Sequence, residues 1–287
     1  TKEFLKLIVK EQGNLVLFKY NQIERDWTQP ALWDCRGLIL DSAGNWNVVA
    51  YPYRKFFNLG EGYGQEIDMT SAKIYTKSDG SLITLYWYKD KWNVATTGTI
   101  DASSDANAGQ YTFADLFWKA AEVVYGSVEE FVSRIDTNFN YMFELMTPYN
   151  LVVTLHSDFK LELHGVRDMR TWKEVDIDSI TNLVKVKTCD DIKSIEDIYA
   201  SFEGMTWQEE GYIICDKNFN RVKIKNPAYV AAHHIATGQS PYFIMSIVKA
   251  NELDEFLVYF PTRKDEFYDL QNKYNSFIAY IQNIFDG

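Results

Sequence analysis

The sequence predicts an α+β protein in which strands joined by tight turns dominate residues 1–226, with helices between some of them, and helices alone follow over residues 227–287. Two observations support this division. Short runs of β-branched and aromatic residues, separated by turn-forming residues, dominate as far as Asn226. From Pro227 onward, apolar residues recur at helical spacing instead. With 287 residues, the chain is long enough for one large domain and a small helical one.

The first hundred residues read as strands and turns. We expect a short helix before a strand at 15–20, a polar loop ending at Pro30, a segment at 31–40 centred on Cys35-Arg36-Gly37, a turn at 41–45 and a strand at 46–50. Further strands are predicted at 72–76 and in a hairpin over 82–97. The glycines of 60–64 are not followed by Gly-Lys-Ser/Thr, so we interpret them as an ordinary loop.

The remaining residues combine helices and strands. Helices are predicted at 113–125, 128–135 and 192–202, and strands at 141–146, 151–155, 161–166, 211–215 and 221–225. The last two strands have the spacing of a hairpin. The C-terminal part contains predicted helices at 228–236, 242–250, 253–260 and 264–285.

The composition is that of an ordinary globular protein, with 46% hydrophobic and 24% charged residues. Lys and Arg number 29 against 40 Asp and Glu, and the net charge of −11 argues against wholesale coating of a polyanion. A local basic patch can still hold a nucleic acid. The aromatic content of 16% favours a packed core and leaves room for base stacking.

The sequence contains no apolar run long enough to span a bilayer, and its first residues lack the apolar core of a signal peptide. We therefore expect a cytoplasmic protein, in the host cell if the source is viral. Cys35, Cys189 and Cys215 are too few and too scattered for a disulfide framework or a Cys-type zinc site. We expect them to be reduced structural residues.

The stretch from Tyr75 to Leu82 carries the main functional hypothesis. Its centre, Lys77-Ser78-Asp79-Gly80-Ser81, has an ordinary interpretation as a hairpin turn, because Asp and Gly supply the local bonding and positive φ of tight turns. Its place between two predicted strands also suits a lysine held rigidly as a nucleophile.

A lysine nucleophile needs other cations close by. A free lysine has a pKa near 10.4 and is almost wholly protonated at neutral pH, whereas desolvation and nearby positive charge favour the neutral amine. The predicted strand at 221–225 places Lys223 and Lys225 on one face, with Val222 and Ile224 on the other, because successive side chains alternate. These lysines are therefore candidate partners of Lys77.

Two carboxylates accompany these strands. Glu144 stands alone in the apolar run at 141–146, and a buried unpaired carboxylate is costly, so it either faces solvent or has a cation or ligand as its partner. Glu210 precedes the strand at 211–215, whose hairpin would bring this carboxylate into the pocket of Lys223 and Lys225.

Taken in order, six short motifs resemble the nucleotidyltransferase motifs of covalent polynucleotide ligases. The resemblance is closest to the RNA ligase 1 family, typified by the single-strand RNA ligase of T-even bacteriophages. The motifs are Cys35-Arg36-Gly37, Lys55-Phe56-Phe57-Asn58, Lys77-Ser78-Asp79-Gly80-Ser81, Phe143-Glu144-Leu145, Glu210-Gly211-Tyr212 and Lys223-Ile224-Lys225. Each motif is weak alone, and their order over residues 31–230 carries the resemblance.

The resemblance implies an adenylyltransferase domain over residues 1–226, built from antiparallel sheets with flanking helices, and a small all-α domain over 227–287. Lys77 would attack the α-phosphorus of ATP and expel pyrophosphate. AMP would then pass to an RNA 5′-phosphate, and a 3′-hydroxyl would seal the strand, as in the repair of cleaved tRNA. The implied ligands are ATP, Mg²⁺ or Mn²⁺, and RNA with a 5′-phosphate and a 3′-hydroxyl. We expect the protein to be a monomer and not to bind a membrane.

The resemblance also assigns roles to individual residues. Lys77, Lys223 and Lys225 would be catalytic, because the last two neutralise the transferring phosphate. The metal would be held by Asp79, Glu144 and Glu210, with Glu144 also a candidate for the ribose. Arg36 and Lys55 would clamp phosphate oxygens. The implied ATP-binding residues are Arg36, Lys55, Phe57, Asn58, Thr76, Lys77, Gly80, Glu144, Glu210, Lys223 and Lys225.

Two departures from the family pattern concern substrate binding. Thr97 precedes Gly98 where phage relatives often have a lysine. Residues 227–287 are shorter than the helical C-terminal domain of the family's founding member, and their seven acidic against four basic residues make them a poor generic RNA-binding surface. The alternatives are a DNA ligase or capping enzyme with the same lysine chemistry, and a catalytically inactive RNA- or nucleotide-binding protein. No OB-fold-like all-β segment follows residue 226, which disfavours DNA ligases and capping enzymes.

Overall fold

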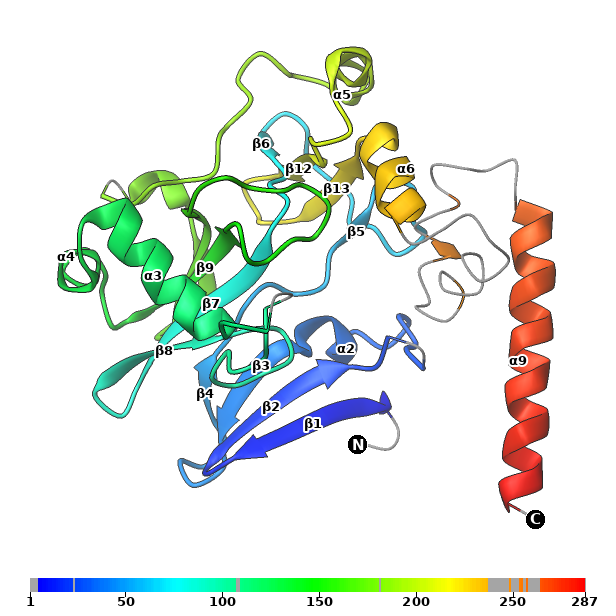
Figure 1. Cartoon of the computed structure of the whole chain (residues 1–287), viewed down its shortest axis with the longest axis horizontal. Helices are drawn as coiled ribbons and strands as arrows, with labels where there is room; N and C mark the ends of the chain where they lie inside the picture. Colours follow the sequence, from blue (N-terminus) through cyan, green and yellow to red (C-terminus); the bar gives the residue numbers. More distant parts are fainter. Residues whose placement is uncertain are drawn as a thin grey trace.

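The computed structural model of the chain describes residues 5–22, 24–106, 109–180, 182–236, 248, 253–254, 257 and 264–286 (Figure 1). Three β-sheets form its body, with helices on their outer faces. Within the described ranges, none of the helices combines the length and the apolar character needed to cross a lipid bilayer.

The sheets are named here A, B and C, and each is given in spatial order. Sheet A contains β1 (Leu7–Gln12), β2 (Leu15–Tyr20), β3 (Arg36–Asp41) and β4 (Asn47–Ala50). Sheet B contains β5 (Phe57–Asn58), β13 (Arg221–Lys225), β12 (Gly211–Cys215) and β6 (Lys73–Thr76). Sheet C contains β11 (Lys173–Val175), β10 (Lys160–Asp168), β9 (Phe139–Met146), β7 (Ser81–Tyr88) and β8 (Lys91–Ala95). Neighbouring strands are antiparallel throughout, except for the parallel pair β13 and β5.

The α-helices are α2 (Ala31–Asp34), α3 (Phe113–Tyr125), α4 (Val128–Val132), α5 (Ile195–Ser201), α6 (Pro227–Ala236) and α9 (Lys264–Asp286). Single 3₁₀ turns lie at Ile177–Ser179 and Phe202–Gly204. Helix α3 begins with a capping box, in which Thr112 and Asp115 satisfy each other's backbone N–H groups, and it ends at Gly126 with a φ of 91°.

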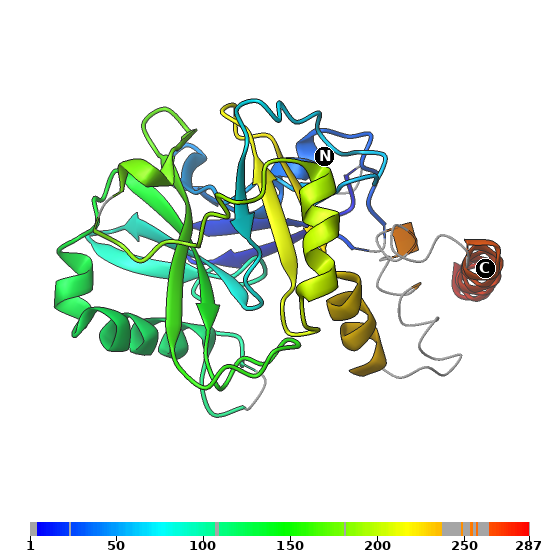
Figure 2. The ribbon, with the colours of Figure 1, turned by 90° about the horizontal axis from the view of Figure 1, so that it is seen from above.

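Helices α3 and α4 cover the face of sheet C that points away from sheet B (Figure 2). Leu116, Phe117 and Ala120 lie on one side of α3 because they are spaced three and four residues apart, and they pack on Phe143 of β9. This apolar contact anchors the central strand of sheet C.

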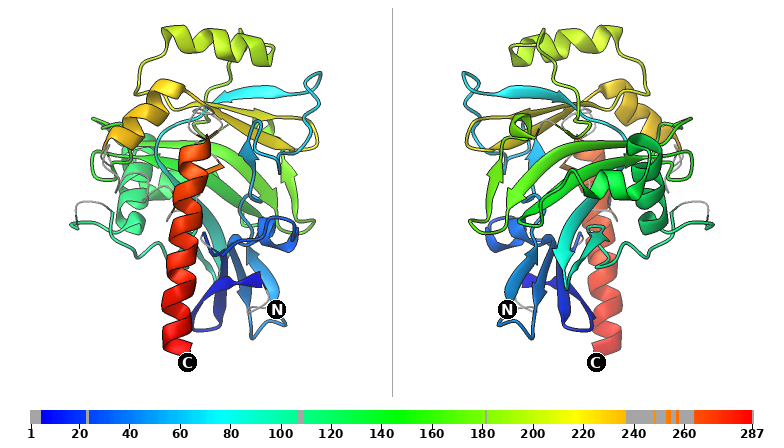
Figure 3. Two further views of the ribbon diagram at one scale, coloured as in Figure 1. Left: turned by 90° about the vertical axis from the view of Figure 1, so that its right-hand side faces the viewer. Right: turned by 90° about the vertical axis from the view of Figure 1, so that its left-hand side faces the viewer.

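Helix α5 covers the outer face of sheet B (Figure 3). Its Ile198 is fully buried against Ile214 of β12 and against Val222 and Ile224 of β13. Alternation along these strands therefore turns the other set of side chains, including Lys223 and Lys225, toward the interior between the sheets. The predicted split of residues 221–225 into an apolar and a basic face is confirmed.

The predicted α+β class with antiparallel sheets and flanking helices is confirmed. The short helix expected before Leu15 falls partly on residues 1–4, which lie outside the described ones, and β1 adds a strand that was not predicted. Residues 151–155 form an irregular loop where a strand is predicted, and the backbone N–H groups of Val153 and Thr154 bond a carboxylate, Asp79.

The C-terminal helices are described in part. Helices α6 and α9 confirm the predictions at 228–236 and 264–285. The helices predicted at 242–250 and 253–260 lie almost wholly outside the described residues. Helix α9 stands to one side of the sheets (Figure 1), whereas Tyr229 of α6 donates a hydrogen bond to Asp79 at 2.9 Å. The predicted domain boundary at 227 stays a prediction.

Candidate active site

A cavity of about 400 Å³ lies where the three sheets meet. This volume is in the range of small-molecule sites. The lining contains seven Lys and Arg against four Asp and Glu, so the cavity is locally basic in a protein whose net charge is −11. The sequence-predicted residues that line it are Arg36, Lys55, Thr76, Lys77, Gly80, Glu144, Glu210, Lys223 and Lys225.

The strand register of sheet B aligns the three lysines predicted to be catalytic. Lys225 is paired with Gly211 across β13 and β12, and the Lys77 backbone N–H donates to the Gly211 carbonyl at 2.8 Å. Lys223 occupies the next row of the same face, opposite Ile213. Gly211 has a φ of 133°, and a Cβ there would collide with the Ile224 carbonyl oxygen, so only glycine fits between these strands.

Glu210 lies between two of these lysines. Its Oε2 is 2.8 Å from Lys77 Nζ, and its Oε1 is 3.6 Å from Lys225 Nζ. The Glu210 side chain is 7% exposed, whereas the lysines retain 22% and 21%. The carboxylate is thus a hydrogen-bond acceptor for the Lys77 amine, while both amines can still reach a molecule in the cavity.

The segment from Lys77 to Gly80 crosses from one sheet to another. It links β6 of sheet B to β7 of sheet C, so the interpretation as a hairpin turn is wrong. Gly80 lies against β9, where a Cβ would approach the Leu145 carbonyl oxygen to 2.6 Å. Close packing, and no positive φ, therefore explains the glycine after Asp79.

Asp79 does not line the cavity, in contrast to its predicted role as a metal ligand. Its Oδ2 accepts hydrogen bonds from the backbone N–H groups of Val153 at 3.0 Å and Thr154 at 2.6 Å. Its Oδ1 accepts from the Tyr229 hydroxyl at 2.9 Å. The structure therefore gives this buried carboxylate three protein donors, and these tie the Lys77 segment to a loop and to helix α6.

Glu144 has a close neighbour, His164, that the sequence did not reveal. Its Oε2 lies 3.3 Å from Nε2 of His164. His164 occupies a β-bulge in β10, where the pairing with β9 skips from Leu163 to Gly165, and bulges re-aim side chains in this way. The His164 Nδ1 faces the Tyr53 hydroxyl at 3.0 Å. Only the glycine beside His164 hints at the bulge from the sequence.

Arg36 and Lys55 form a second basic wall of the cavity. Within the described part of the chain, Nη1 of Arg36 is buried without a hydrogen-bond partner, which suits an anion from outside the protein. The Lys55 ammonium lies 4.9 Å from the centre of the Phe57 ring and 5.6 Å from that of Trp27. These aromatic faces hold the ammonium at the cavity edge.

Phe57 and Asn58, which are among the predicted ATP-binding residues, lie behind this wall and do not line the cavity. Phe57 packs edge-on against Trp27 and Trp33. Asn58 is fully buried and donates to Glu61 Oε2 from both its backbone N–H and its side-chain amide, each at 2.9 Å. Both residues therefore support Lys55 from the side that faces away from the cavity.

An apolar group lines the cavity beside the lysines. It includes Tyr75, Val175, Ile177, Val186 and Ile213. Tyr75 and Ile213 are paired across β6 and β12, one row from the Lys77 contact with Gly211. An apolar slot next to a basic wall suits a ligand with an aromatic ring at one end and anionic groups at the other.

Burial shifts the pKa values of two groups in this lining. It raises the pKa of the Tyr75 phenol to about 12. Burial likewise raises the pKa of the Cys215 thiol to about 11, although the neighbouring Arg221 opposes this shift. Both groups are therefore neutral at pH 7, and the charge of the lining resides on its lysines, arginines and carboxylates.

Two carboxylates of the lining, Glu144 and Glu210, suit a divalent ion. Among the described residues, no three His, Cys, Asp or Glu side chains gather as a preformed metal-binding group. Mg²⁺ is commonly held by one or two carboxylates together with substrate phosphates and water. The donor set therefore fits an ion that arrives with a phosphate-bearing ligand.

A protein-family model described as RNA ligase matches residues 34–229, about two thirds of the chain. The RNA ligase of Rhodothermus phage RM378 is 25% identical in an alignment covering 98% of this chain and 77% of that protein. A protein of Autographa californica nuclear polyhedrosis virus, whose name assigns it polynucleotide kinase and RNA ligase activities, is 26% identical. That alignment covers 88% of this chain and 38% of the viral protein, so the chain spans well under half of that relative.

Among solved structures, an archaeal ATP-dependent RNA ligase superimposes with a TM-score of 0.56 at 12% identity. The superposition covers 95% of this chain and 74% of the archaeal one. At this level of identity the likeness concerns the fold, in which antiparallel sheets enclose the cavity described above.

Proposed function

This chain belongs to the RNA ligase family, and from that premise we propose that it is an ATP-dependent RNA ligase that forms a covalent lysine-AMP intermediate. The observation that carries the proposal is the placement of Lys77 on a cavity wall with Lys223, Lys225 and Glu210. A primary amine beside cations and one carboxylate suits attack on a phosphorus atom.

In the first step, Nζ of Lys77 forms a bond to the α-phosphorus of ATP, and the bond to the pyrophosphate oxygen breaks. Glu210 accepts the hydrogen bond of this amine at 2.8 Å and is placed to take up its proton. Lys223 and Lys225 stabilise the negative charge that grows on the phosphoryl oxygens. Adenine would occupy the apolar slot around Tyr75 and Ile213.

Arg36 and Lys55 are proposed to hold the departing pyrophosphate and, later, the RNA 5′-phosphate. The buried Nη1 of Arg36 is one donor for such an anion. Glu144 and Glu210 would hold Mg²⁺ or Mn²⁺, which neutralises phosphate charge when bound. Thr76 and Gly80 shape the cavity on either side of Lys77, and Gly80 does so by its lack of a side chain.

In the later steps, the RNA 5′-phosphate attacks the phosphorus of lysine-AMP and releases Lys77. A 3′-hydroxyl then attacks the activated 5′-phosphate, so that a phosphodiester forms and AMP leaves. We infer that the enzyme acts as a monomer in the cytoplasm, of a host cell if the source is viral, on cleaved RNAs such as tRNA. Measurement of its mass in solution tests the monomer, and ligation of tRNA halves tests the substrate.

The test of the covalent step is intact-protein mass spectrometry after incubation with ATP and Mg²⁺, on protein first stripped of AMP by pyrophosphate. The wild type should gain one AMP, whereas Lys77→Ala and the charge-preserving Lys77→Arg should gain none. A gain in Lys77→Ala, or no gain in the wild type, would overturn the proposal. A gain from GTP in place of ATP would favour capping chemistry.

The second test separates RNA from DNA ligation. Adenylylated protein is mixed with 5′-phosphorylated RNA or DNA of one sequence, and transfer of AMP to each strand is followed. We expect transfer to RNA and sealing to a 3′-hydroxyl. Preferential transfer to a DNA nick would identify a DNA ligase, and tight RNA binding without transfer would identify a binding protein.

A further inference from the structure

A second cavity, of about 330 Å³, adjoins the first. The two share Lys55, Phe56, Phe219 and Arg221, which form the partition between them. The remaining lining residues of the second cavity are Arg54, Gln65, Arg167, Lys173, Glu174, Asn218 and Asn220. None of these seven belongs to the motifs that carry the family resemblance.

The second cavity is strongly basic. Its lining holds five Lys and Arg but a single carboxylate, Glu174. Arg167 and Arg221 pair with that carboxylate, and Arg54 pairs with Asp34 at 2.7 Å. Lys173 is exposed, and no carboxylate of the described residues pairs with it. The cavity therefore presents more positive charge than its own carboxylate neutralises, which favours an anionic ligand.

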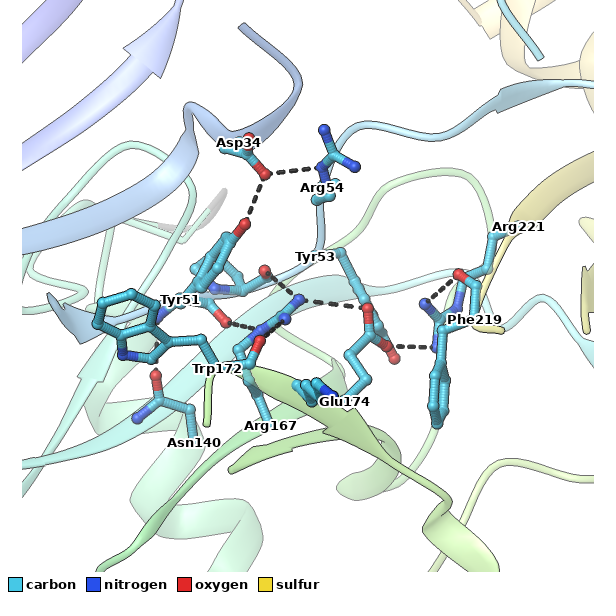
Figure 4. A network of polar contacts seen from close by, with 12 residues as sticks. Asp34, Tyr51, Tyr53, Arg54, Asn140, Arg167, Trp172, Glu174, Phe219 and Arg221 are labelled. Atoms are coloured by element: carbon cyan, nitrogen blue, oxygen red, sulfur yellow. Dashed lines mark hydrogen bonds and ion pairs between the residues drawn. The ribbon is translucent and has the colours of Figure 1, made fainter. Parts of the chain in front are cut away.

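Hydrogen bonds and ion pairs between the protein's own residues hold the wall of this cavity (Figure 4). Phe219 and Trp172 occupy turns with φ values of 62° and 59°, a left-handed conformation that bulky residues seldom adopt. Nη1 of Arg221 donates to the Phe219 carbonyl at 3.3 Å, and Nη1 of Arg167 donates to the Trp172 carbonyl at 2.6 Å. Glu174 joins the two arginines, so one network fixes both turns.

Aromatic side chains complete the cavity. Phe56 and Phe219 lie in the partition toward the first cavity, and the hydrogen bond from Arg221 to the Phe219 carbonyl fixes the turn that carries Phe219. A basic groove with aromatic faces is the pattern by which proteins bind single-stranded nucleic acid, because bases stack on the rings while cations follow the phosphates. Free pyrophosphate has no ring that could stack on an aromatic side chain.

We propose that the second cavity binds the RNA strand next to its reacting 5′ end, with a backbone phosphate near Lys173 and Arg54 and a base against Phe219. This subsite rests on the proposed ligase function and extends it to residues outside the family motifs. The partition then separates two tasks: the first cavity holds the nucleotide and the reacting phosphate, and the second holds the strand behind it.

The experiment compares Lys173→Gln with Lys91→Gln, which removes an exposed lysine from β8, at the opposite edge of sheet C. Formation of lysine-AMP is measured without RNA, and single-turnover transfer of AMP is then measured against the concentration of 5′-phosphorylated RNA. For Lys173→Gln we expect unchanged lysine-AMP formation and about a tenfold higher half-saturating RNA concentration. Lys91→Gln should match the wild type in both assays.

Two further readouts distinguish direct contact from an indirect structural effect. Lys173→Gln should reduce the dependence of log affinity on log salt by about 0.7, as expected for one lost phosphate contact on a single strand. Phe219→Leu should weaken RNA binding and leave this salt dependence unchanged, because stacking releases no counterions. Equal melting temperatures would show that both variants are folded.

Unchanged RNA affinity and salt dependence in Lys173→Gln would overturn the proposal. Slower lysine-AMP formation, or slower reversal by pyrophosphate, in Lys173→Gln would also overturn it and assign the cavity to pyrophosphate. Direct binding of 5′-phosphorylated RNA, followed by fluorescence anisotropy, is independent of chemistry. Failure of the wild type to form lysine-AMP would therefore refute the ligase function. RNA binding at the second cavity could still be confirmed or refuted by the anisotropy measurement.

Discussion

The molecule contains two clusters of the same kind, each with one carboxylate between two cations. In the first cavity, Glu210 lies 2.8 Å from Lys77 and 3.6 Å from Lys225. Between the cavities, Glu174 lies 3.2 Å from Arg167 and 2.7 Å from Arg221. The lysines are 22% and 21% exposed, whereas the arginines are 6% and 10% exposed.

The difference teaches what each cluster is suited to do. An arginine has five donors in a rigid plane, and Arg167 uses them on Glu174 and on the carbonyls of Tyr51, Pro52 and Trp172. A lysine amine is a compact charge on a flexible stem and can exchange its partner. The arginine cluster therefore holds the sheets and turns in place, while the lysine cluster can change partners during a reaction.

The largest effect is expected from Glu174→Ala. Removal of this carboxylate leaves two buried guanidinium groups without their counter-charge, and breaking a buried pair typically costs about 3–5 kcal/mol. We expect the free energy of unfolding, measured by urea denaturation, to fall by about that amount. The matched control is Glu210→Ala in the more exposed cluster, which should lose less. Equal losses of unfolding free energy in both variants would contradict the division between a structural arginine cluster and a catalytic lysine cluster.

The next effect is on catalysis. Lys225→Ala and Lys223→Ala should each slow lysine-AMP formation by about 100- to 1,000-fold, because each removes positive charge from the transferring phosphate. Their unfolding free energies should stay close to that of the wild type. Lys223→Arg and Lys225→Arg preserve the charge and test its position. A wild-type rate of lysine-AMP formation in either alanine variant would remove that lysine from the site.

Cys215 reports whether a reagent can reach the part of the first cavity next to Arg221, because Cys215 and Arg221 are paired across β12 and β13. Because its pKa is raised to about 11, we expect alkylation by iodoacetamide at pH 8 to be roughly 100-fold slower than for an ordinary thiol. The raised pKa contributes stability that is fully present below the ordinary value of 9.0 and is lost as the pH rises toward 11. Rapid labelling of native Cys215 at pH 8 would show that this part of the cavity is open.

The smallest effect concerns Asp79, which belongs to neither cluster. In Asp79→Asn the side-chain oxygen can still accept from Val153 and Thr154, while the amide nitrogen cannot accept from the Tyr229 hydroxyl. We expect a loss of about 1 kcal/mol in unfolding free energy and an unchanged Mg²⁺ titration of lysine-AMP formation. A shifted titration would restore Asp79 as a metal ligand.

The features that follow from local periodicity were predictable. Alternation along 221–225 gives the correct faces for Lys223 and Val222, because side chains on a strand have a period of two. The spacing of apolar residues in α3 likewise gives its buried side. Nine of the predicted site residues line the first cavity. They could be predicted because the order of the motifs carries information that no single motif has.

What depends on distant partners was not predictable. The roles of Asp79 and His164 are set by Tyr229 and by a bulge opposite β9, and neither relation leaves a local pattern. The same holds for Asn58, which is predicted to bind ATP but whose side-chain amide nitrogen donates to Glu61. Turn chemistry also misled, since Lys77 to Gly80 resembles a hairpin turn yet joins two different sheets.

The hydrogen bond from Tyr229 to Asp79 spans 150 residues of sequence and has a consequence for biosynthesis. A ribosome that adds about 5–20 residues per second needs roughly 8–30 s to travel from one partner to the other. During that interval the segment that holds Lys77 lacks strands β12 and β13 as well as helix α6. The nascent chain therefore cannot assemble this site until its last strands emerge, and a truncated translation product would carry the lysine without the site.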